Sequence, residues 1–243
     1  MVNSKLIKNN IVIIGDVIID KYIDGKINKI SPEAPIPILE FTNSFSRFGG
    51  ASNVAINVSR LIGKCSLIMN QNNEGFNFKE LEKENIKLIW NGNSEKYSVK
   101  TRIICNQHQF IRIDKDEIVP KDFCDFKSIL NNLVTGDILM ISDYGKGAAK
   151  SSQEIIKFCK ERKVATMVDP KFPSWINYEG AEIMKCNRKE FIEHRKYDNL
   201  SIDLNKKTLQ ESLEKYKFNI LIVTLGSKGL CIVDKKGNYK LFE

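Results

Sequence analysis

Short apolar runs alternate along most of this chain with stretches whose apolar residues recur every three or four positions. Each short run has the length of a buried strand, and each longer stretch has the spacing of a helix with one buried face. Strands that alternate with helices build a mostly parallel sheet covered by helices on both faces. The pattern therefore predicts an α/β, doubly wound sheet with strands at 11–14, 65–69, 86–90, 137–141, 164–168, 182–185, 219–224, 230–233 and 239–242.

Helical spacing also locates the helices between these strands. The clearest follows a pair of glycines and ends at Gly63, a residue type that commonly terminates helices. Another, over 151–163, opens with Ser151 and Glu154 at the spacing of a capping box. The remaining helices are expected from about residue 76, over 122–133, from 187 and over 206–217.

The glycine pair, Gly49-Gly50, forms a candidate ligand site. Glycine lets another molecule approach the backbone closely, and the first turn of a helix offers N–H groups without partners. Asn53 adds an amide that both donates and accepts hydrogen bonds. This arrangement suits a polyol or an anion, although a tight loop entering a packed helix has the same pattern. Asp20, expected at the end of a core strand, is a candidate hydroxyl acceptor or a turn residue.

Residues 21–46 and 97–114 interrupt the alternation of strands and helices. The first segment carries Gly25 and three prolines, at 32, 35 and 37, and predicts short strand pieces outside the main sheet. The second predicts extended segments at 99–105 and 110–114, joined by the polar turn 106–109. Together they predict a small β flap, or lid.

Four polar clusters follow predicted strands. Because parallel strands end at the same edge of a sheet, these clusters are expected to lie along one edge, where such folds build their ligand sites. Each cluster alone is also compatible with an ordinary loop. They are SDYGKG at 142–147, DPK at 169–171, CNRKE at 186–190 and TLGSKG at 224–229.

Composition narrows the classes of function. The net charge of +8 comes from 38 basic residues scattered among 30 acidic ones, so we expect no nucleic-acid partner, and an anionic small molecule suits the charge equally well. Six cysteines without a CxxC pair indicate free thiols in a reducing, cytoplasmic setting. His108 and His194 are expected at the surface or in the lid, not as catalysts. No signal peptide or membrane-spanning run is expected.

With these motifs assembled, the chain resembles ribokinase-type (PfkB family) sugar kinases over residues 11–243. It is most similar to the heptose 7-phosphate kinases of bacterial ADP-heptose synthesis. The segments that carry the resemblance occur in that family's order, and the pairing of KISPEAP with SDYGKG is its most specific part. They are GDVIIDKYIDGKINKISPEAPIPI, FGGASNVAINV, SDYGKG, VDPK, NRKEF and VTLGSKG.

The resemblance implies a ribokinase-like fold that uses ATP and Mg²⁺ to phosphorylate the C1 hydroxyl of D-glycero-D-manno-heptose 7-phosphate. It also implies a role for each matching position. Sugar binding is implied for Asp20, Gly49, Gly50, Asn53, Asp143 and Lys146. Nucleotide contacts are implied for Asn187, Glu190, Thr224, Gly226 and Gly229, with Glu190 helping to organise magnesium.

The substrate's own phosphate requires cations, and the charge and position of five basic residues make them candidates. The two lid segments of relatives often pair between subunits, so the resemblance further implies a homodimer through the lid. The candidate phosphate ligands are Arg47, Lys100, Arg102, Arg112 and Lys171.

One departure from the family concerns catalysis. Ribokinase-type enzymes carry a Gly-Ala-Gly-Asp motif whose aspartate is the general base, and no Gly-x-Gly-Asp occurs in these 243 residues. We therefore expect a single kinase domain over 1–243 that stops before this segment and has impaired activity. Two alternatives are open: a kinase for another sugar, and a non-catalytic sugar-phosphate-binding protein.

Overall fold

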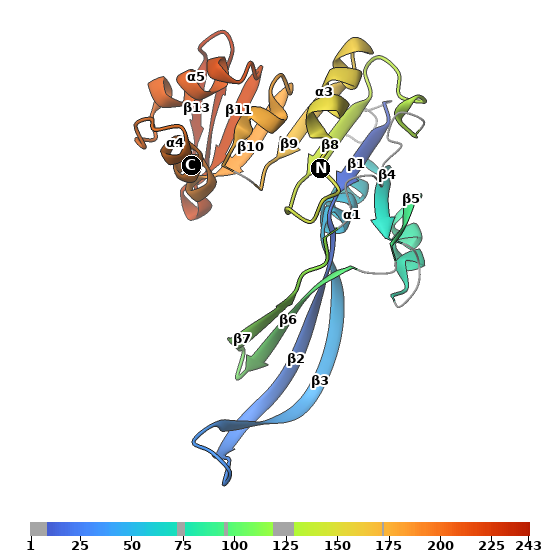
Figure 1. Ribbon diagram of the computed structural model, residues 1–243, viewed down its shortest axis with the longest axis vertical. Helices are drawn as coiled ribbons and strands as arrows, with labels where there is room; N and C mark the ends of the chain where they lie inside the picture. The colour runs from blue at the N-terminus through green and yellow to red at the C-terminus, as the bar shows by residue number, and fades with distance from the viewer. Residues whose placement is uncertain (1–8, 72–75, 95–96, 119–128, 172) are drawn as a thin grey trace.

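The computed structural model describes residues 9–71, 76–94, 97–118, 129–171 and 173–243. Two sheets dominate it. A nine-stranded sheet forms the body, and a four-stranded sheet projects from one end of that body (Figure 1). We call the smaller sheet the lid; it comprises residues 17–50 and 98–115.

Parallel pairing fixes the body sheet, whose strand order is β13-β12-β11-β10-β9-β8-β1-β4-β5. The seven strands from β11 to β5 in this order pair in parallel, and the last two strands of the chain add an antiparallel edge. The strands are β1 (Ile11–Gly15), β4 (Cys65–Gln71), β5 (Ile86–Ser94), β8 (Ile138–Ser142), β9 (Ala165–Asp169), β10 (Ile183–Asn187), β11 (Ile220–Thr224), β12 (Leu230–Asp234) and β13 (Tyr239–Phe242).

Helices cover both faces of this sheet, because alternate residues of a strand point to opposite faces. On β1, Val12 and Ile14 join a core that includes residues of α3 (Ser152–Glu161), α4 (Arg188–Tyr197) and α5 (Lys206–Lys215). Ile11 and Ile13 join the opposite core, which is built with α1 (Ala51–Ile62) and the 3₁₀ helix η2 (Phe78–Glu84). Two further 3₁₀ turns are η3 (Trp175–Tyr178) and η4 (Gly226–Lys228). The doubly wound fold class is confirmed.

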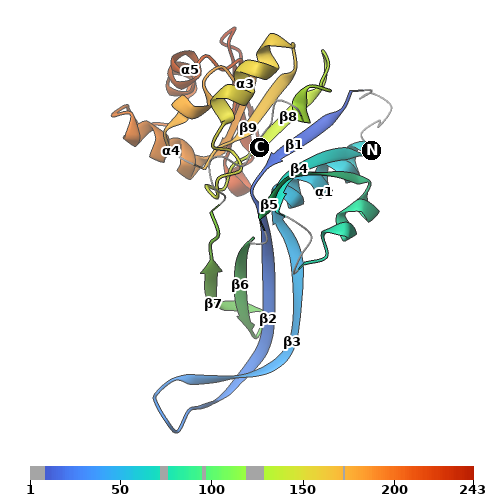
Figure 2. The same cartoon turned by 45° about the vertical axis from the view of Figure 1, so that its right-hand side comes forward.

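The lid consists of long strands in the order β3-β2-β6-β7. It extends well beyond the helices, as the rotated view makes plain (Figure 2). Its centre is the parallel pair β2 and β6, and each of these pairs antiparallel with one outer strand. The strands are β2 (Val17–Ile30), β3 (Pro37–Gly50), β6 (Ser98–Cys105) and β7 (His108–Lys115).

The lid differs from the sequence-based expectation in two ways. Short strand pieces were expected over 21–46, but the structure has two 14-residue strands that start earlier and end later. Asp20 was expected at the end of a core strand. The core strand instead ends at Gly15, and Asp20 lies on lid strand β2. Pairing of β2 with β3 runs from Val17 opposite Gly50 to Ile30 opposite Pro37, with two register shifts, and so continues through the glycines and polar residues.

Some local predictions are confirmed and others are wrong. Helix α1 ends at Gly63, which has a φ of 101° as a left-handed cap should. The capping box predicted from Ser151 does not form, because its side chain caps no N–H group of α3. The helix expected from residue 76 is the 3₁₀ helix η2. Most of the helix expected over 122–133 lies outside the described residues.

The two histidines differ in exposure. His108 is exposed on the lid, as expected. His194 is fully buried, which contradicts the expectation of a surface position. It stacks on Trp175 with ring centroids 3.7 Å apart, and its Nδ1 lies 2.9 Å from the Pro173 carbonyl oxygen.

None of the helices among the described residues combines the length and apolarity needed to cross a membrane.

Candidate functional site

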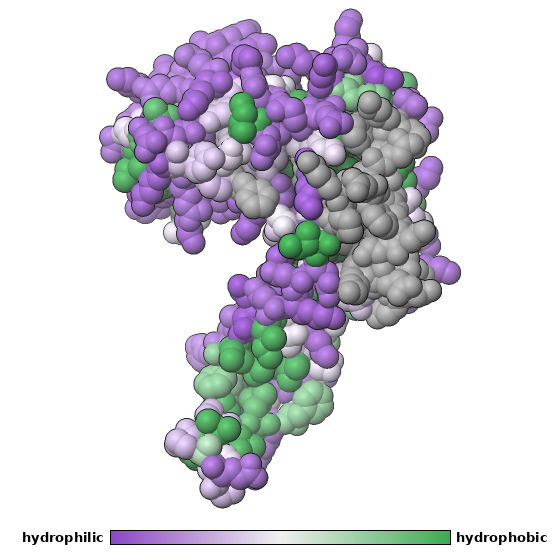
Figure 3. Space-filling model, viewed as in Figure 1, coloured by the Kyte–Doolittle hydropathy of each residue, from purple (hydrophilic) through white to green (hydrophobic). Residues whose placement is uncertain are grey.

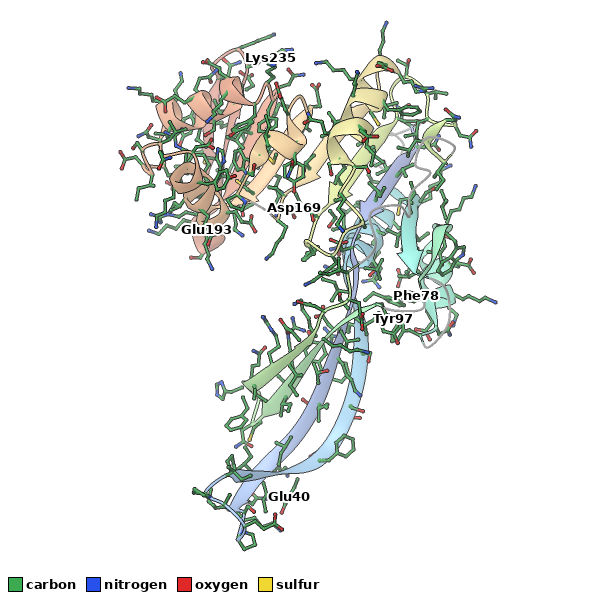
Figure 4. All side chains as sticks on the ribbon, in the orientation of Figure 1. Glu40, Phe78, Tyr97, Asp169, Glu193 and Lys235 are labelled. Carbon is green, nitrogen blue, oxygen red and sulfur yellow. The ribbon has the colours of Figure 1, made fainter. Side chains whose placement is uncertain are left out.

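The predicted polar clusters meet along one edge of the body sheet. Ser142, Asp169, Asn187 and Thr224 are the last residues of four consecutive parallel strands, β8 to β11. Ser142 is paired with Asp169, and Asn187 with Thr224, so each pair of neighbouring clusters begins at the same level of the sheet. In Figure 4 the labelled Asp169 lies at the end of the sheet from which the lid projects, and Lys235 lies at the opposite end. The candidate site therefore lies between this edge and the lid.

The glycine pair allows the lid to meet helix α1 without a steric clash. Gly49 is paired with Ile18, and a Cβ at Gly49 would overlap the Asp20 carboxylate. Gly50 has a φ of 57°, and a Cβ there would overlap the carbonyl oxygen of Asp16. Glycine is therefore required at both positions for reasons of space, and at Gly50 also for its backbone conformation. Asp20 lies directly against the start of α1 as a result.

One face of the lid gathers the predicted sugar and phosphate ligands. Residues directly opposite each other on paired strands point to the same face. Asp20 is opposite both Arg47 and Lys100. One step outward, Tyr22 is opposite Arg102. The face so defined, which we call the charged lid face, consists of Asp20, Tyr22, Phe45, Arg47, Lys100, Arg102, Arg112 and Asp114.

Ion pairs and aromatic rings hold these cations in place. The Arg102 guanidinium donates to the Asp20 carboxylate. Arg47 lies 5.2 Å from the ring centroid of Phe45, and within the described residues it has no acidic partner. Lys100 and Arg112 both pair with Asp114, at 3.0 and 2.8 Å, and the Lys100 hydrogen bond is the main cause of the lowered pKa of that carboxyl. The charged lid face is thus ordered by contacts within itself.

Hydrogen bonds and an ion pair within the protein hold the loop that follows β8. Asp143 is almost fully buried and accepts hydrogen bonds from the Tyr178 hydroxyl and from the Gly145 N–H at 2.7 Å. Burial raises the pKa of Asp143, and these two hydrogen bonds oppose the rise. Lys146 forms an ion pair of 2.5 Å with Asp116, which follows the last lid strand. Asp143 and Lys146, which were both predicted to bind sugar, therefore make intramolecular contacts that shape this loop.

The predicted nucleotide residues occupy the ends of β10 and β11. Asn187 caps helix α4 by accepting the Glu190 N–H at 2.9 Å, and a carboxylate oxygen of Glu190 accepts the Asn187 N–H at 2.7 Å. The N-x-x-E pattern is therefore a capping box in this chain. The turn after Thr224 closes through the Leu225 N–H, which donates to the Gly229 carbonyl at 2.8 Å.

Gly226 and Gly229 adopt left-handed φ values of 66° and 83° in that turn. At Gly229 a side chain would also collide with the backbone carbonyl of Phe242. Such a turn leaves backbone N–H groups close to any molecule lying over it, a property of glycine-rich turns that bind phosphates.

One charged residue of this edge, Lys185, was not predicted from the sequence. Lys185 Nζ contacts both carboxylate oxygens of Asp169, at 3.1 and 2.9 Å. Burial acts to lower the pKa of Lys185, but the charge of Asp169 and its hydrogen bond outweigh burial. The pKa of Lys185 is therefore raised. Alternation along β10 puts Lys185 on the same face as Asn187, and that spacing was the available signal.

Tyr144 lies among these charges. Burial is the main cause of its raised pKa, and the carboxylates of Asp169, Asp20 and Glu190 add to it. Lys171 is exposed beside the same edge, and its charge acts on Asp143. Residues from the lid, β9 and α4 are therefore electrostatically coupled around the loop that follows β8.

The predicted residues do not share a single cavity. Arg47 and Asn53 line a hollow of about 450 Å³ beside α1, together with Phe48, Arg60 and Phe76. Asp143 lines a separate hollow of about 150 Å³ with Gly145 and Tyr178. The chain thus brings Asp20 next to Arg102 and Gly49, but it leaves Asn53 and Asp143 in different hollows.

Comparison with known proteins assigns the family. Residues 8–241 match the pfkB family of carbohydrate kinases. The bifunctional protein HldE of Hydrogenovibrio crunogenus is 30% identical over 233 residues, which cover 94% of this chain and 48% of that protein. The bifunctional protein HldE of Aliarcobacter butzleri is 32% identical and is covered to 50%. The chain spans about half the length of these relatives.

Solved structures agree on the fold. Phosphofructokinase-2 from Escherichia coli, in complex with fructose-6-phosphate, superposes with a TM-score of 0.73 at 18% identity, over 96% of this chain and 79% of that one. Ribokinase from Thermotoga maritima gives a TM-score of 0.70 at 18% identity, over 96% of this chain and 77% of that one. These structures share the fold, and the family match extends over nearly the whole sequence. This chain therefore belongs to the PfkB family of carbohydrate kinases.

Proposed function

We propose that this chain binds a heptose phosphate and takes part in its ATP-dependent phosphorylation at C1, giving heptose 1,7-bisphosphate for ADP-heptose synthesis. The charged lid face is the observation that carries the proposal. It sets a carboxylate, Asp20, beside three arginines and a lysine, against the glycine start of a helix. A sugar phosphate needs both kinds of partner, because hydroxyls favour carboxylate acceptors and the phosphate favours guanidinium groups.

The sugar end is proposed to bind around Asp20, Gly49, Gly50 and Asn53. The second oxygen of Asp20 fills the space that a side chain at Gly49 would take, so this glycine lets the carboxylate lie against the chain that enters α1. For the existing phosphate we propose Arg47, Lys100, Arg102, Arg112 and Lys171. Arg47 is the strongest of these, because its guanidinium stacks on aromatic rings and needs no rearrangement of an ion pair before it binds an anion.

The nucleotide end is proposed to lie over the ends of β10 and β11. Magnesium in phosphotransfer sites is commonly held by one or two carboxylates, with waters and the phosphates completing its shell. Glu190 is half-exposed, and only one of its carboxylate oxygens accepts the Asn187 N–H in the helix cap. The other oxygen therefore fits as such a ligand. Within the described residues no cluster of three or more His, Cys, Asp or Glu side chains that could hold a metal ion occurs.

Lys185 is proposed to contact the transferred phosphoryl group. Phosphoryl transfer depends on alignment and on neutralising charge more than on covalent steps by the protein. Lys185 contacts Asp169 at the end of β9, and this carboxylate raises the pKa of Lys185 against the lowering effect of burial. Magnesium, when bound with ATP, would supply the rest of the charge neutralisation.

The second lid face supports a homodimer. It carries Ile23, Phe41, Ile103, Ile111 and Ile113, and the last two are 47% and 53% exposed. Figure 3 shows hydrophobic residues concentrated on the lid, whereas the body is mostly hydrophilic. Substituting Ile111 and Ile113 with lysine is expected to leave the body folded and to convert a dimer to a monomer in sedimentation. A wild-type chain that sediments as a monomer would contradict this assembly.

The catalytic proposal is tested with heptose 7-phosphate and Mg-ATP. Because the 243 residues contain no Gly-x-Gly-Asp motif, sugar binding and phosphoryl transfer are measured separately. Slow ADP release, with a new phosphorus resonance for a C1 phosphate, is the expected result, because these residues lack the general base of that motif. Faster ADP release with fructose 6-phosphate would favour a kinase for another sugar. Sugar-phosphate binding without ADP release by the folded chain would favour a non-catalytic binding protein.

A further inference from the structure

Asp16 is a fully buried carboxylate at the point where the chain leaves the body sheet and enters the lid. It is the one residue between β1 and β2. Its backbone N–H donates to the Ser142 carbonyl at 3.2 Å, and its own carbonyl accepts the Ala51 N–H at 2.9 Å. Asp16 therefore touches the end of β8, the start of α1 and the root of the lid at once.

The carboxylate of Asp16 is satisfied by one loop. Its Oδ2 accepts the N–H groups of Tyr144 and Lys146, at 2.8 and 3.0 Å. Its Oδ1 accepts the Ala148 N–H at 2.9 Å. Within the described residues no lysine or arginine pairs with it. Three backbone donors from alternate residues of a single five-residue stretch thus surround one buried anion.

This arrangement depends on the loop's conformation. Gly145 and Gly147, the residues between the three donors, have left-handed φ values of 74° and 107°. Alternating left-handed residues turn successive N–H groups toward one side of a loop and create an anion-binding concavity. Burying a carboxylate without hydrogen-bond donors is very unfavourable, so the Asp16 side chain favours the loop shape that supplies these three N–H groups.

We propose that Asp16 is a positioning residue that fixes the 143–148 loop relative to the lid and to helix α1. It acts through the groups it holds: Lys146, which is tied to the lid by Asp116, and Gly50, whose close approach to the Asp16 carbonyl sets the start of α1. The proposal rests on the proposed function in one respect, namely that the sugar phosphate binds between these three segments.

Asp137 provides a matched control. It is also a buried aspartate, at 2% exposure, and it accepts the backbone N–H groups of Asn10 and Val134 at 2.8 and 3.0 Å. It precedes β8, whereas Asp16 follows β1, so the two carboxylates lie at opposite ends of one strand pair. A role limited to satisfying buried backbone would make Asp16 and Asp137 equivalent.

The experiment compares Asp16→Asn with Asp137→Asn. An asparagine keeps the shape but puts an NH₂ group against N–H donors. Both variants are expected to melt at lower temperature. Only Asp16→Asn is expected to raise hydrogen exchange of the 144, 146 and 148 amides tenfold or more, and to raise the dissociation constant for heptose 7-phosphate at least tenfold.

Two outcomes would overturn the inference. The first is equal weakening of sugar-phosphate binding by both variants, and the second is unchanged exchange at these three amides in Asp16→Asn. If that variant does not fold, exchange in the wild-type chain decides, because amides that exchange like an exposed loop would contradict the bonds to Asp16. If the wild type exchanges as expected but does not bind heptose 7-phosphate, the proposed function fails and the role of Asp16 in the loop stands.

Discussion

The body sheet and the lid use their strands for different purposes. Strands β8 to β11 are five residues long, and alternate residues on them are buried, completely so at Leu221 and Val223. The lid strands β2 and β3 are 14 residues long; beyond their roots β3 is mostly exposed, and β2 is largely half-buried or exposed. Apolar burial is the main stabilising contribution to folding, so the stability of this chain resides in the body. The lid instead arranges charge on one face and apolar surface on the other.

The largest effect expected from this comparison is on the body. Truncating Leu221 to alanine removes a fully buried side chain from β11 of the body sheet and leaves a cavity. The free energy of unfolding is expected to fall by about 2–5 kcal/mol, measured by denaturant titration. A loss below about 1 kcal/mol would show that this part of the sheet is loosely packed.

The buried His194 gives the body a dependence on pH. Burial lowers its pKa to about 4, against about 6.5 in an unfolded chain. The unfolded chain therefore binds more protons between these values, and stability is lost as the pH falls from about 6.5 towards 4. Between pH 7 and pH 5 the loss is expected to be about 2 kcal/mol. His194→Phe should lack this part of the pH dependence in urea titrations, and an unchanged slope would contradict it.

On the lid, the expected effect is on binding. Arg102→Glu removes the partner of Asp20 and places two carboxylates side by side. The dissociation constant for the sugar phosphate is expected to rise about tenfold or more, equivalent to about 1.4 kcal/mol. Lys235→Glu makes the same change of charge at the opposite end of the sheet (Figure 4) and is expected to have little effect. Equal effects of the two variants would reduce the role of Arg102 to general electrostatic attraction.

The smallest effect is expected at the tip of the lid. Ile30 is 61% exposed, so Ile30→Ala removes few contacts. Its free energy of unfolding is expected to stay within about 0.5 kcal/mol of the wild type in the same denaturant titration as Leu221→Ala. A loss comparable to that of Leu221→Ala would show that the lid contributes to the stability of the body.

The same contrast explains what the sequence could predict. Apolar runs such as 219–224 are continuous and bounded by polar residues, so the body strands follow from burial alone. Lid strands alternate on an exposed sheet and carry proline, glycine and charge, so their length follows from pairing between segments distant in sequence. Their extent could not be derived from local pattern.

The candidate site divides in a similar way. The position of the four polar clusters at the ends of strands was predictable from the topology of the sheet. The glycine pair, Gly49 and Gly50, could be singled out because it stands before a helix. The inward roles of Asp143 and Asp16 were not predictable, because their partners are Tyr178 and backbone amides more than 30 and 120 residues away. The ion pair of Lys185 with Asp169 was not predictable either, because it depends on β9 and β10 being neighbours in the sheet.

The most direct test of the account is a calorimetric titration of this chain with D-glycero-D-manno-heptose 7-phosphate and with the same heptose lacking its phosphate. Recognition by the charged lid face predicts binding of the phosphorylated sugar at one molecule per chain, at least tenfold tighter than the unphosphorylated one. Equal affinities, or no binding by a folded sample, would contradict the claim that this face recognises a sugar phosphate.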